Sequence, residues 1–198
     1  MLDWLKNINK EYPPFWKVYL SKFESKPRRF VVMSTESSGF NPAKDVLYSF
    51  GAIAIVENKI VIGDNFETVM LQYKFLHDQG LSNDFLIKSD LPKMTEPQAI
   101  EAFINYIGNA VLVGHRIHLA VDLINEALER LYCGRLKNEA LDIEIMHRKL
   151  NDLPERPYSL DNLYKFYKIP AGERIAVTDD AYNLSMIFLK LKVKLGIN

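Results

Sequence analysis

The chain has 198 residues, of which 48% are hydrophobic, and its 25 Lys and Arg residues balance its 25 Asp and Glu residues. This length supports one compact core and excludes a large second domain, so a single α/β domain is expected. The zero net charge excludes a protein that attracts polyanions through its overall field, and a nucleic-acid site must then be a local patch. The single cysteine, Cys133, excludes an internal disulfide.

The N-terminal residues, Met1 to Lys10, mix charged and apolar side chains, and no apolar run of seven or more follows them. We therefore expect no signal peptide. The sequence has no stretch of eighteen consecutive apolar residues, so no membrane span and no membrane partner are expected. Together these features favour a cytoplasmic protein.

Apolar and aromatic residues recur at helical spacing between Phe15 and Phe23, directly after a Pro-Pro pair. This pattern predicts a short amphipathic helix that packs on the main body, a reading favoured over a partner-binding helix. A small basic cluster, from Lys22 to Arg29, follows and is typical of a solvated linker. We expect residues 1–28 to form an N-terminal helical extension and residues 29–198 to form the main domain.

The first part of the main domain reads as three antiparallel strands. Residues 29–33 predict a buried strand that enters a turn at Ser34, and residues 48–56 and 60–71 predict two longer strands joined by a turn at 57–59. The stretch from 72 to 94 is irregular. Thr95 and Gln98 then form a capping box at the start of a helix.

The second part of the main domain alternates strands and helices. Residues 110–113 predict a short inner strand, a helix surrounds Ile124, and Leu141-Asp142 ends a fifth strand. The last helix is expected to begin at Thr178, with an apolar face that recurs every three or four residues. The fold class predicted is therefore α/β: a mixed five-stranded sheet, three strands antiparallel and then two parallel, flanked by helices.

Three segments place polar residues where a strand is expected to end or a helix to begin. The first is Ser34-Thr35-Glu36-Ser37-Ser38-Gly39-Phe40, the second is His115-Arg116 with Ala120 five residues after the histidine, and the third is Ile175 five residues before Asp180-Ala181. Each segment alone is weak evidence, because a turn or a helix start explains it equally well. Their shared order and spacing carry the argument.

That order resembles the DnaQ-like (DEDDh) 3′–5′ exonucleases of the ribonuclease H-like superfamily, and it is similar to the proofreading (epsilon) subunit of bacterial DNA polymerase III. The resemblance runs from about Arg29 to Leu195 and implies a ribonuclease H-like sheet. It also implies that Ser34 and Ala120 replace two metal-binding aspartates and that Ile175 replaces the histidine that activates water. Glu36 and Asp180 remain as carboxylate remnants of the active site.

Two-metal hydrolysis holds two divalent ions roughly 3.5–4 Å apart. Even in bulk water their mutual repulsion at ~4 Å is about 4 kcal/mol, and the two missing acids are what would offset it. We therefore expect at most one weakly held Mg²⁺ or Mn²⁺ on Glu36 and Asp180. His118 is a candidate replacement ligand or base, whereas Asp122 is expected to point away from the site.

Three functions stay open. The leading hypothesis is a protein that binds nucleotide or single-stranded nucleic acid, with catalysis lost or strongly impaired. The binding residues that the resemblance implies for it are Thr35, Ser37, Ser38, Gly39, Phe40, His115 and Arg116. The alternatives are a slow metal-dependent 3′–5′ exonuclease acting on DNA or RNA, and a non-catalytic scaffold for an unknown protein partner.

Overall fold

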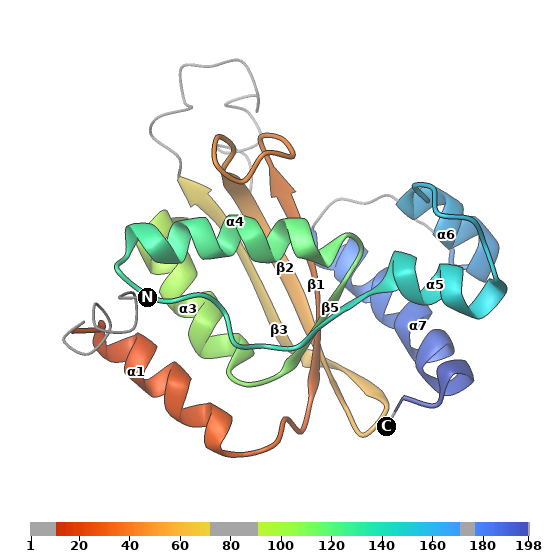
Figure 1. Ribbon diagram of the computed structural model, residues 1–198, viewed down its shortest axis with the longest axis horizontal. Helices are drawn as coiled ribbons and strands as arrows, with labels where there is room; N and C mark the ends of the chain where they lie inside the picture. The colour runs from red at the N-terminus through yellow and green to blue at the C-terminus, as the bar shows by residue number, and fades with distance from the viewer. Residues whose placement is uncertain (1–10, 72–90, 171–176, 198) are drawn as a thin grey trace, which may run out of the picture.

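The computed structural model describes residues 11–71, 91–170 and 177–197. A six-stranded mixed sheet in the order β4-β3-β2-β1-β5-β6 runs through its centre (Figure 1). β1, β2 and β3 are antiparallel, β5 and β6 run parallel to β1, and β4 runs parallel to β3. The strands are β1 (Phe30–Ser37), β2 (Leu47–Val56), β3 (Lys59–Leu71), β4 (Lys93–Thr95), β5 (Val111–Gly114) and β6 (Ala140–Asp142).

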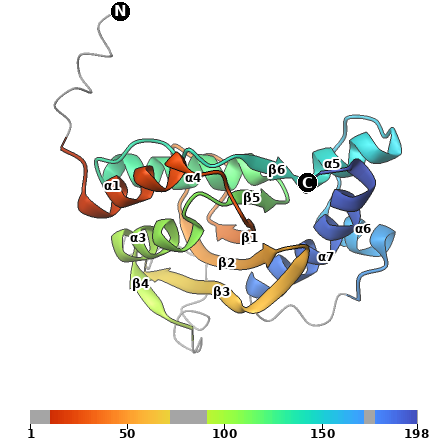
Figure 2. The ribbon, with the colours of Figure 1, turned by 90° about the horizontal axis from the view of Figure 1, so that it is seen from below.

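Helices cover both faces of this sheet, as Figures 1 and 2 show. One face carries α1 (Pro14–Ser21), α3 (Glu96–Ile107) and α4 (Ile117–Arg130); the other carries α5 (Ile143–Asn151), α6 (Leu160–Tyr167) and α7 (Val177–Leu195). A short 3₁₀ turn, Lys22–Glu24, follows α1. Each face has its own apolar core, because alternate residues of β1 point to opposite sides. The predicted fold class, a mixed sheet between helices, is confirmed.

The predicted number of strands is wrong by one. β4 begins inside the stretch expected to be irregular and pairs with the end of β3, with Val69 opposite Lys93. Three residues are too few to show a strand periodicity, and β4 runs directly into the α3 capping box at Thr95, which is confirmed. Most of the predicted irregular stretch, residues 72–90, lies outside the described residues.

The first strand is also longer than predicted. Ser34 does not begin a turn, because β1 continues to Ser37 and remains paired with β2, with Ser34 opposite Gly51. The register shifts between Glu36 and Ser37, where a bulge ends the regular pairing. The first motif therefore lies mostly on a strand, and its side chains alternate between the two faces of the sheet.

The helix predicted near the N-terminus is present and packs on the main body. Trp16 and Tyr19 are 1% and 0% exposed and belong to the core beneath α3 and α4. The Tyr19 hydroxyl donates to Asn138 Oδ1 at 2.7 Å and accepts from the Lys137 amide at 2.8 Å. Burial raises the pKa of Tyr19 to about 12. These bonds hold α1 against the segment that leads into β6.

Gly51 lets the first turn of α7 lie directly on β2. A Cβ atom at this position would come 2.4 Å from the Val177 carbonyl carbon and 2.5 Å from the Thr178 nitrogen. We expect Gly51→Ala to lower the free energy of unfolding by roughly 2–3 kcal/mol, because backbone must move to admit the methyl group. Urea unfolding measures this loss. Gly63→Ala in β3 is the control, since nothing lies within 4 Å of its Cβ position; an equal loss there would contradict the explanation.

His147 on α5 gives the fold a pH dependence. Its ring is 2% exposed, lies 2.7 Å from the Tyr167 hydroxyl, and has its pKa lowered by burial, an effect that the nearby Glu144 partly opposes. Because the unfolded chain, with an ordinary histidine pKa of about 6.5, binds a proton more readily than the folded chain, stability falls as the pH is lowered through this value. We expect His147→Gln to flatten the decline between about pH 7 and 5.5 in thermal unfolding. His118→Gln, at an exposed side chain, should preserve the decline.

None of the helices among the described residues is long and apolar enough to cross a membrane.

Candidate functional site

A pocket of about 170 Å³, which we call the β1–β5 pocket, lies where β1 and β5 end, between α4 and the first half of α7. The carboxyl ends of neighbouring parallel strands are the usual place for a ligand crevice in an α/β sheet. The structure brings seven of the predicted site residues together around it: Ser34, Thr35, Ser37, Phe40, His115, Arg116 and Ala120. The pocket is completed by apolar side chains, including Leu119, Leu160 and Leu184.

The pleat of β1 decides which way the first motif points. Val32 belongs to the core beneath α7, and Met33 belongs to the core beneath α4. Because strand residues alternate, Ser34 and Glu36 face the α7 side and Thr35 faces the α4 side, and the bulge before Ser37 ends this alternation. β5 lies close to β1 because of Gly114, whose Cβ would come 3.0 Å from the Met33 carbonyl oxygen. His115 follows immediately and reaches the same end of the sheet.

The loop after β1 is held by its own hydrogen bonds. Ser38 Oγ donates to Asp45 Oδ1 at 2.8 Å and accepts from the Val46 amide at 3.1 Å, while the Asn41 amide donates to Asp45 Oδ2. The bonds from Asn41 and Ser38 hold the pKa of Asp45 below its usual value. Ser38 and Gly39 therefore shape the loop and do not line the pocket, whereas Phe40, 78% exposed, stands at its edge.

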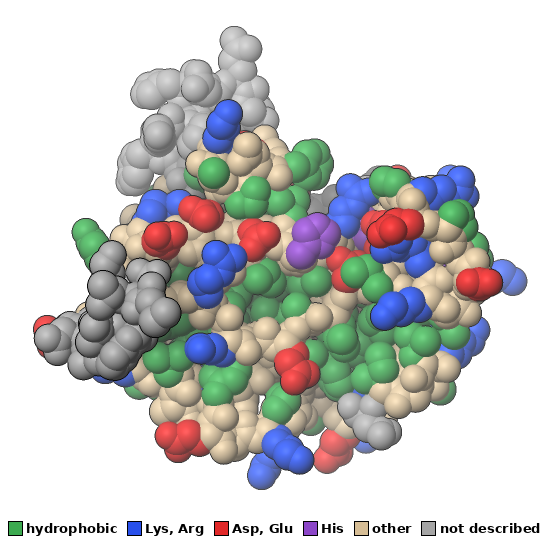
Figure 3. Space-filling model, in the orientation of Figure 1, with side chains coloured by type: hydrophobic (Ala, Val, Ile, Leu, Met, Phe, Trp, Pro, Cys, Tyr) green, Lys and Arg blue, Asp and Glu red, His purple; other side chains and the backbone are tan. Residues whose placement is uncertain are grey.

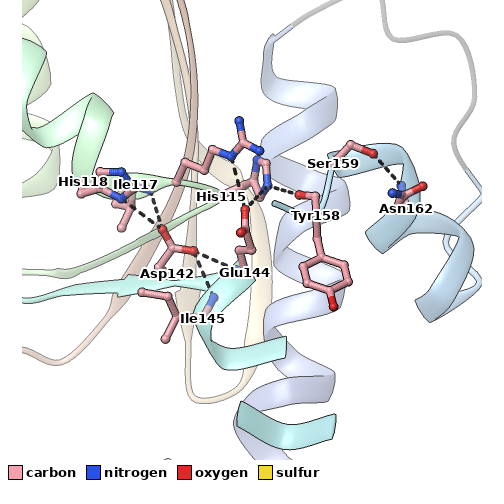
Figure 4. Close-up of polar contacts among 10 residues, drawn as sticks. His115, Ile117, His118, Asp142, Glu144, Ile145, Tyr158, Ser159 and Asn162 are labelled. Carbon is pink, nitrogen blue, oxygen red and sulfur yellow. Dashed lines mark hydrogen bonds and ion pairs between the residues drawn. The ribbon is translucent and has the colours of Figure 1, made fainter. Parts of the chain in front are cut away.

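The second motif forms a cluster of polar contacts, which Figure 4 shows. His115 Nε2 lies 2.7 Å from the Tyr158 carbonyl oxygen and 3.2 Å from Glu144 Oε2. The same carboxylate oxygen lies 3.3 Å from Arg116 Nε. Since Nε2 faces two oxygen acceptors, it is the protonated nitrogen of the ring. Glu144 thus fixes the orientation of His115 and forms an ion pair with Arg116.

Asp142 holds the starts of two helices at once (Figure 4). Its Oδ1 accepts from the amides of Glu144 and Ile145 in the first turn of α5, and its Oδ2 accepts from the Ile117 amide at the start of α4. The side chain is only 7% exposed. His118 Nδ1 lies 3.6 Å from Asp142 Oδ2, so this histidine leans toward Asp142, and it is absent from the lining of the β1–β5 pocket.

The two remaining carboxylates of the motifs lie outside the pocket lining and are engaged by the protein itself. Glu36 Oε2 accepts from Ser49 Oγ at 3.0 Å. Asp180 Oδ1 accepts from the hydroxyl of Tyr164, which is 2% exposed, at 2.8 Å. Asp122, which we expected to point away, forms an ion pair with Arg135 on the surface. Ile175 lies outside the described residues.

These residues do not fit a pair of divalent ions. The described part of the chain contains no cluster of three or more His, Cys, Asp or Glu side chains arranged to hold a metal. Ser34 and Ala120 supply a hydroxyl and a methyl group, and both retained carboxylates already accept hydrogen bonds. Two dications need more negative charge than this to offset their repulsion.

Sequence reasoning missed Glu144, Tyr164 and the capping role of Asp142. The sequence did contain one signal for the cap. Asp142 precedes an apolar residue and is followed two positions later by Glu144, and this pattern is typical of the start of a helix. That signal predicts α5 and its cap. Nothing in the sequence indicates the contacts of Glu144 with His115 or of Tyr164 with Asp180, because they join residues from different elements.

A larger cavity, of about 550 Å³, lies on the neighbouring surface between α4, β6 and α5. Figure 3 looks onto this face, where hydrophobic side chains gather between α4 and α5. Its lining is mainly apolar, including Val121, Ile145 and Met146. Of its polar side chains, Asp142 caps two helices and Asp122 pairs with Arg135. The smaller β1–β5 pocket is the better candidate site, because residues of the first two motifs line it.

No family model matches the chain, but comparisons with known proteins find relatives in sequence and in fold. A DNA polymerase III PolC-type protein of Caldanaerobacter subterraneus is 28% identical over 176 residues, which are 84% of this chain and 12% of that protein. The DNA polymerase III subunit epsilon of Buchnera aphidicola is 25% identical over 182 residues, covering 82% of this chain and 72% of that one. The chain therefore spans about an eighth of the PolC-type relative.

Solved structures of exonuclease I share the fold. One complex with the inhibitor BCBP has a TM-score of 0.66 and 16% identity, over 85% of this chain and 42% of that one. A complex of E. coli exonuclease I with a dT13 oligonucleotide has a TM-score of 0.63. The chain thus has the fold seen in exonuclease I. In sequence the chain is similar to bacterial DNA polymerase III epsilon and PolC-type proteins, and in fold it is similar to exonuclease I.

Proposed function

We propose that this protein binds a nucleotide, or the end of a single-stranded nucleic acid, in the β1–β5 pocket, and that exonuclease catalysis is lost or strongly reduced. The observation that carries the proposal is the convergence of Thr35, Phe40, His115 and Arg116 on one cavity. The dT13 complex of exonuclease I supports it, because that protein holds a single strand on the same fold.

The side chains around the pocket suit a nucleotide. An exposed aromatic ring such as Phe40 offers a surface on which a base stacks, whatever its sequence. Arg116 uses its Nε for Glu144, and its side chain is 39% exposed, so the remaining guanidinium donors can reach a phosphate. A volume of about 170 Å³ is enough for part of a nucleotide, with the base outside against Phe40.

The proposed loss of catalysis rests on the small number of acidic side chains at the site. By resemblance, Ser34 and Ala120 occupy two metal-ligand positions and Ile175 occupies the position of the general base. Loss of such a base typically costs ~10²–10⁴ in rate. The bonds from Ser49 to Glu36 and from Tyr164 to Asp180 further occupy the carboxylates that remain.

Fluorescence titration with short labelled single strands and with nucleoside monophosphates tests binding. Phe40→Ala should weaken binding by roughly 5- to 150-fold if the ring stacks on a base. Tyr132→Ala is the matched control, since Tyr132 is 75% exposed and lies beyond the end of α4, away from the pocket. Absence of saturable binding by the wild-type protein up to millimolar ligand would remove the proposal.

End-labelled DNA and RNA, incubated with Mg²⁺ or Mn²⁺, test catalysis. We expect no cleavage above a protein-free control. Cleavage that requires metal and disappears in Glu36→Ala would instead establish the slow exonuclease. Cleavage that persists in that variant would indicate a contaminating nuclease and would leave the expected result intact.

A further inference from the structure

A cavity of about 470 Å³ lies at the opposite end of the sheet from the β1–β5 pocket. The start of β1, the turn between β2 and β3, and the end of α7 meet there (Figure 1). Its walls are partly apolar, with Phe30, Ile55, Leu141 and Ile197 among them. Nothing in the proposed nucleotide site uses this cavity.

Lys192 lines the cavity although it is only 6% exposed. Its ammonium group donates to Asn58 Oδ1 at 2.9 Å and lies 5.3 Å from the centre of the Phe30 ring. Within the described ranges, no carboxylate oxygen lies within 4.0 Å of this nitrogen. The contacts of Lys192 are therefore neutral, and its charge is not compensated by any of them.

A buried ammonium group without a counterion is unfavourable, because its lost hydration is only partly replaced. The end of the α7 dipole and the Phe30 ring offset part of this cost. An anion that enters the cavity would offset the remaining cost through its attraction to the ammonium group. The buried ammonium group of Lys192 can therefore bind an anionic ligand in this cavity.

The other charged groups limit which anion fits. Arg29 is neutralised by Asp64, with Nη1 and Oδ2 2.6 Å apart. Arg28 is exposed and adds positive charge at the rim, whereas Glu57 and Glu139, also exposed, add negative charge there. A polyanion such as a nucleic-acid strand would meet the rim carboxylates, but a single anionic group can pass them to reach Lys192.

We propose that this cavity binds a small amphiphilic carboxylate. The carboxylate lies against Lys192, with Arg28 at the entrance, and the apolar body lies against Phe30, Leu141 and Ile197. The site is independent of the nucleotide pocket, because the two are at opposite ends of the sheet.

Calorimetric titration of the full chain with hexanoate, up to about 10 mM, tests the proposal, with hexanol as the uncharged probe. We expect saturable binding of hexanoate, binding at least about tenfold weaker in K192M, and a smaller loss in R28A. K194M is the matched control, because Lys194 is exposed in the same last turn of α7. Hexanoate should also raise the melting temperature of the wild-type protein but not that of K192M.

Three results would overturn the site: no saturable hexanoate binding by the wild-type protein, equal affinity in K192M, or equal affinity for hexanol. Phe40→Ala should leave hexanoate binding unchanged, which separates a failure of this site from a failure of the nucleotide pocket. The melting curve of K192M without ligand checks that the variant is folded.

Discussion

Asp142→Ala is expected to lower the free energy of unfolding by roughly 3–5 kcal/mol, since it removes a helix cap and leaves a buried amide without an acceptor. The carboxylate accepts from two amides of α5 and from Ile117 of α4, and its side chain is 7% exposed. For a chain of this length the melting temperature should fall by roughly 6–20 °C.

Urea unfolding and thermal melting measure this loss. Asp142→Asn should lose less, because the amide oxygen still caps one helix while its NH₂ group cannot accept from the other. Asp122→Ala is the control: its exposed ion pair with Arg135 should contribute no more than about 1 kcal/mol. Similar losses in Asp122→Ala and Asp142→Ala would show that Asp142 has no special bridging role.

Asp142 also positions residues of the candidate site. It fixes the start of α4, where Arg116 has a positive φ of 52°, and the start of α5, from which Glu144 reaches His115. A positive φ is uncommon for a residue with a Cβ, so the surrounding bonds must hold this turn. Asp142→Ala should therefore also weaken nucleotide binding through Arg116, although Asp142 does not line the pocket.

Local patterns in the sequence predicted most of the elements. The apolar face of α7, the capping box at Thr95 and the turn at Glu57 and Asn58 are each set by neighbouring residues. Both turn residues have positive φ, as a tight hairpin requires. β4 was missed because it exists only through pairing with the end of β3, and β1 exceeded its predicted length because β2 continues to pair with it.

The spacing of the motifs predicted which residues meet at the candidate site, but it did not predict their hydrogen bonds. Motif spacing indicated that His115, Arg116 and Ala120 would meet the end of the first strand, and these residues do line one pocket with Ser34 and Thr35. The spacing could not indicate that Ser38 is used by Asp45, or that Asp180 accepts from Tyr164. Such bonds depend on how separate elements pack, and a single sequence carries no direct record of them.

Placing acids at Ser34 and Ala120, with Ser34→Asp and Ala120→Asp together, is expected to destabilise the metal-free protein by roughly 2–4 kcal/mol. The reason is that Ala120 is 8% exposed, and a carboxylate there loses hydration beside other negative charge. Mn²⁺ should then restore stability by mass action, because the ion binds the folded site and not the unfolded chain. The wild-type protein should show little change in melting temperature with Mn²⁺.

The hydrogen bond from Tyr164 to Asp180 limits this recovery, since a metal competes with the hydroxyl for the carboxylate. Adding Tyr164→Phe to the double variant should therefore enlarge the Mn²⁺-dependent rise in melting temperature, whereas Tyr167→Phe, whose hydroxyl contacts His147, should not. The neutral pair Ser34→Asn and Ala120→Asn separates charge from size. If that pair responded to Mn²⁺ as strongly as the acidic pair, negative charge would not be what limits metal binding at the site, and the electrostatic basis of the proposed loss of catalysis would be wrong.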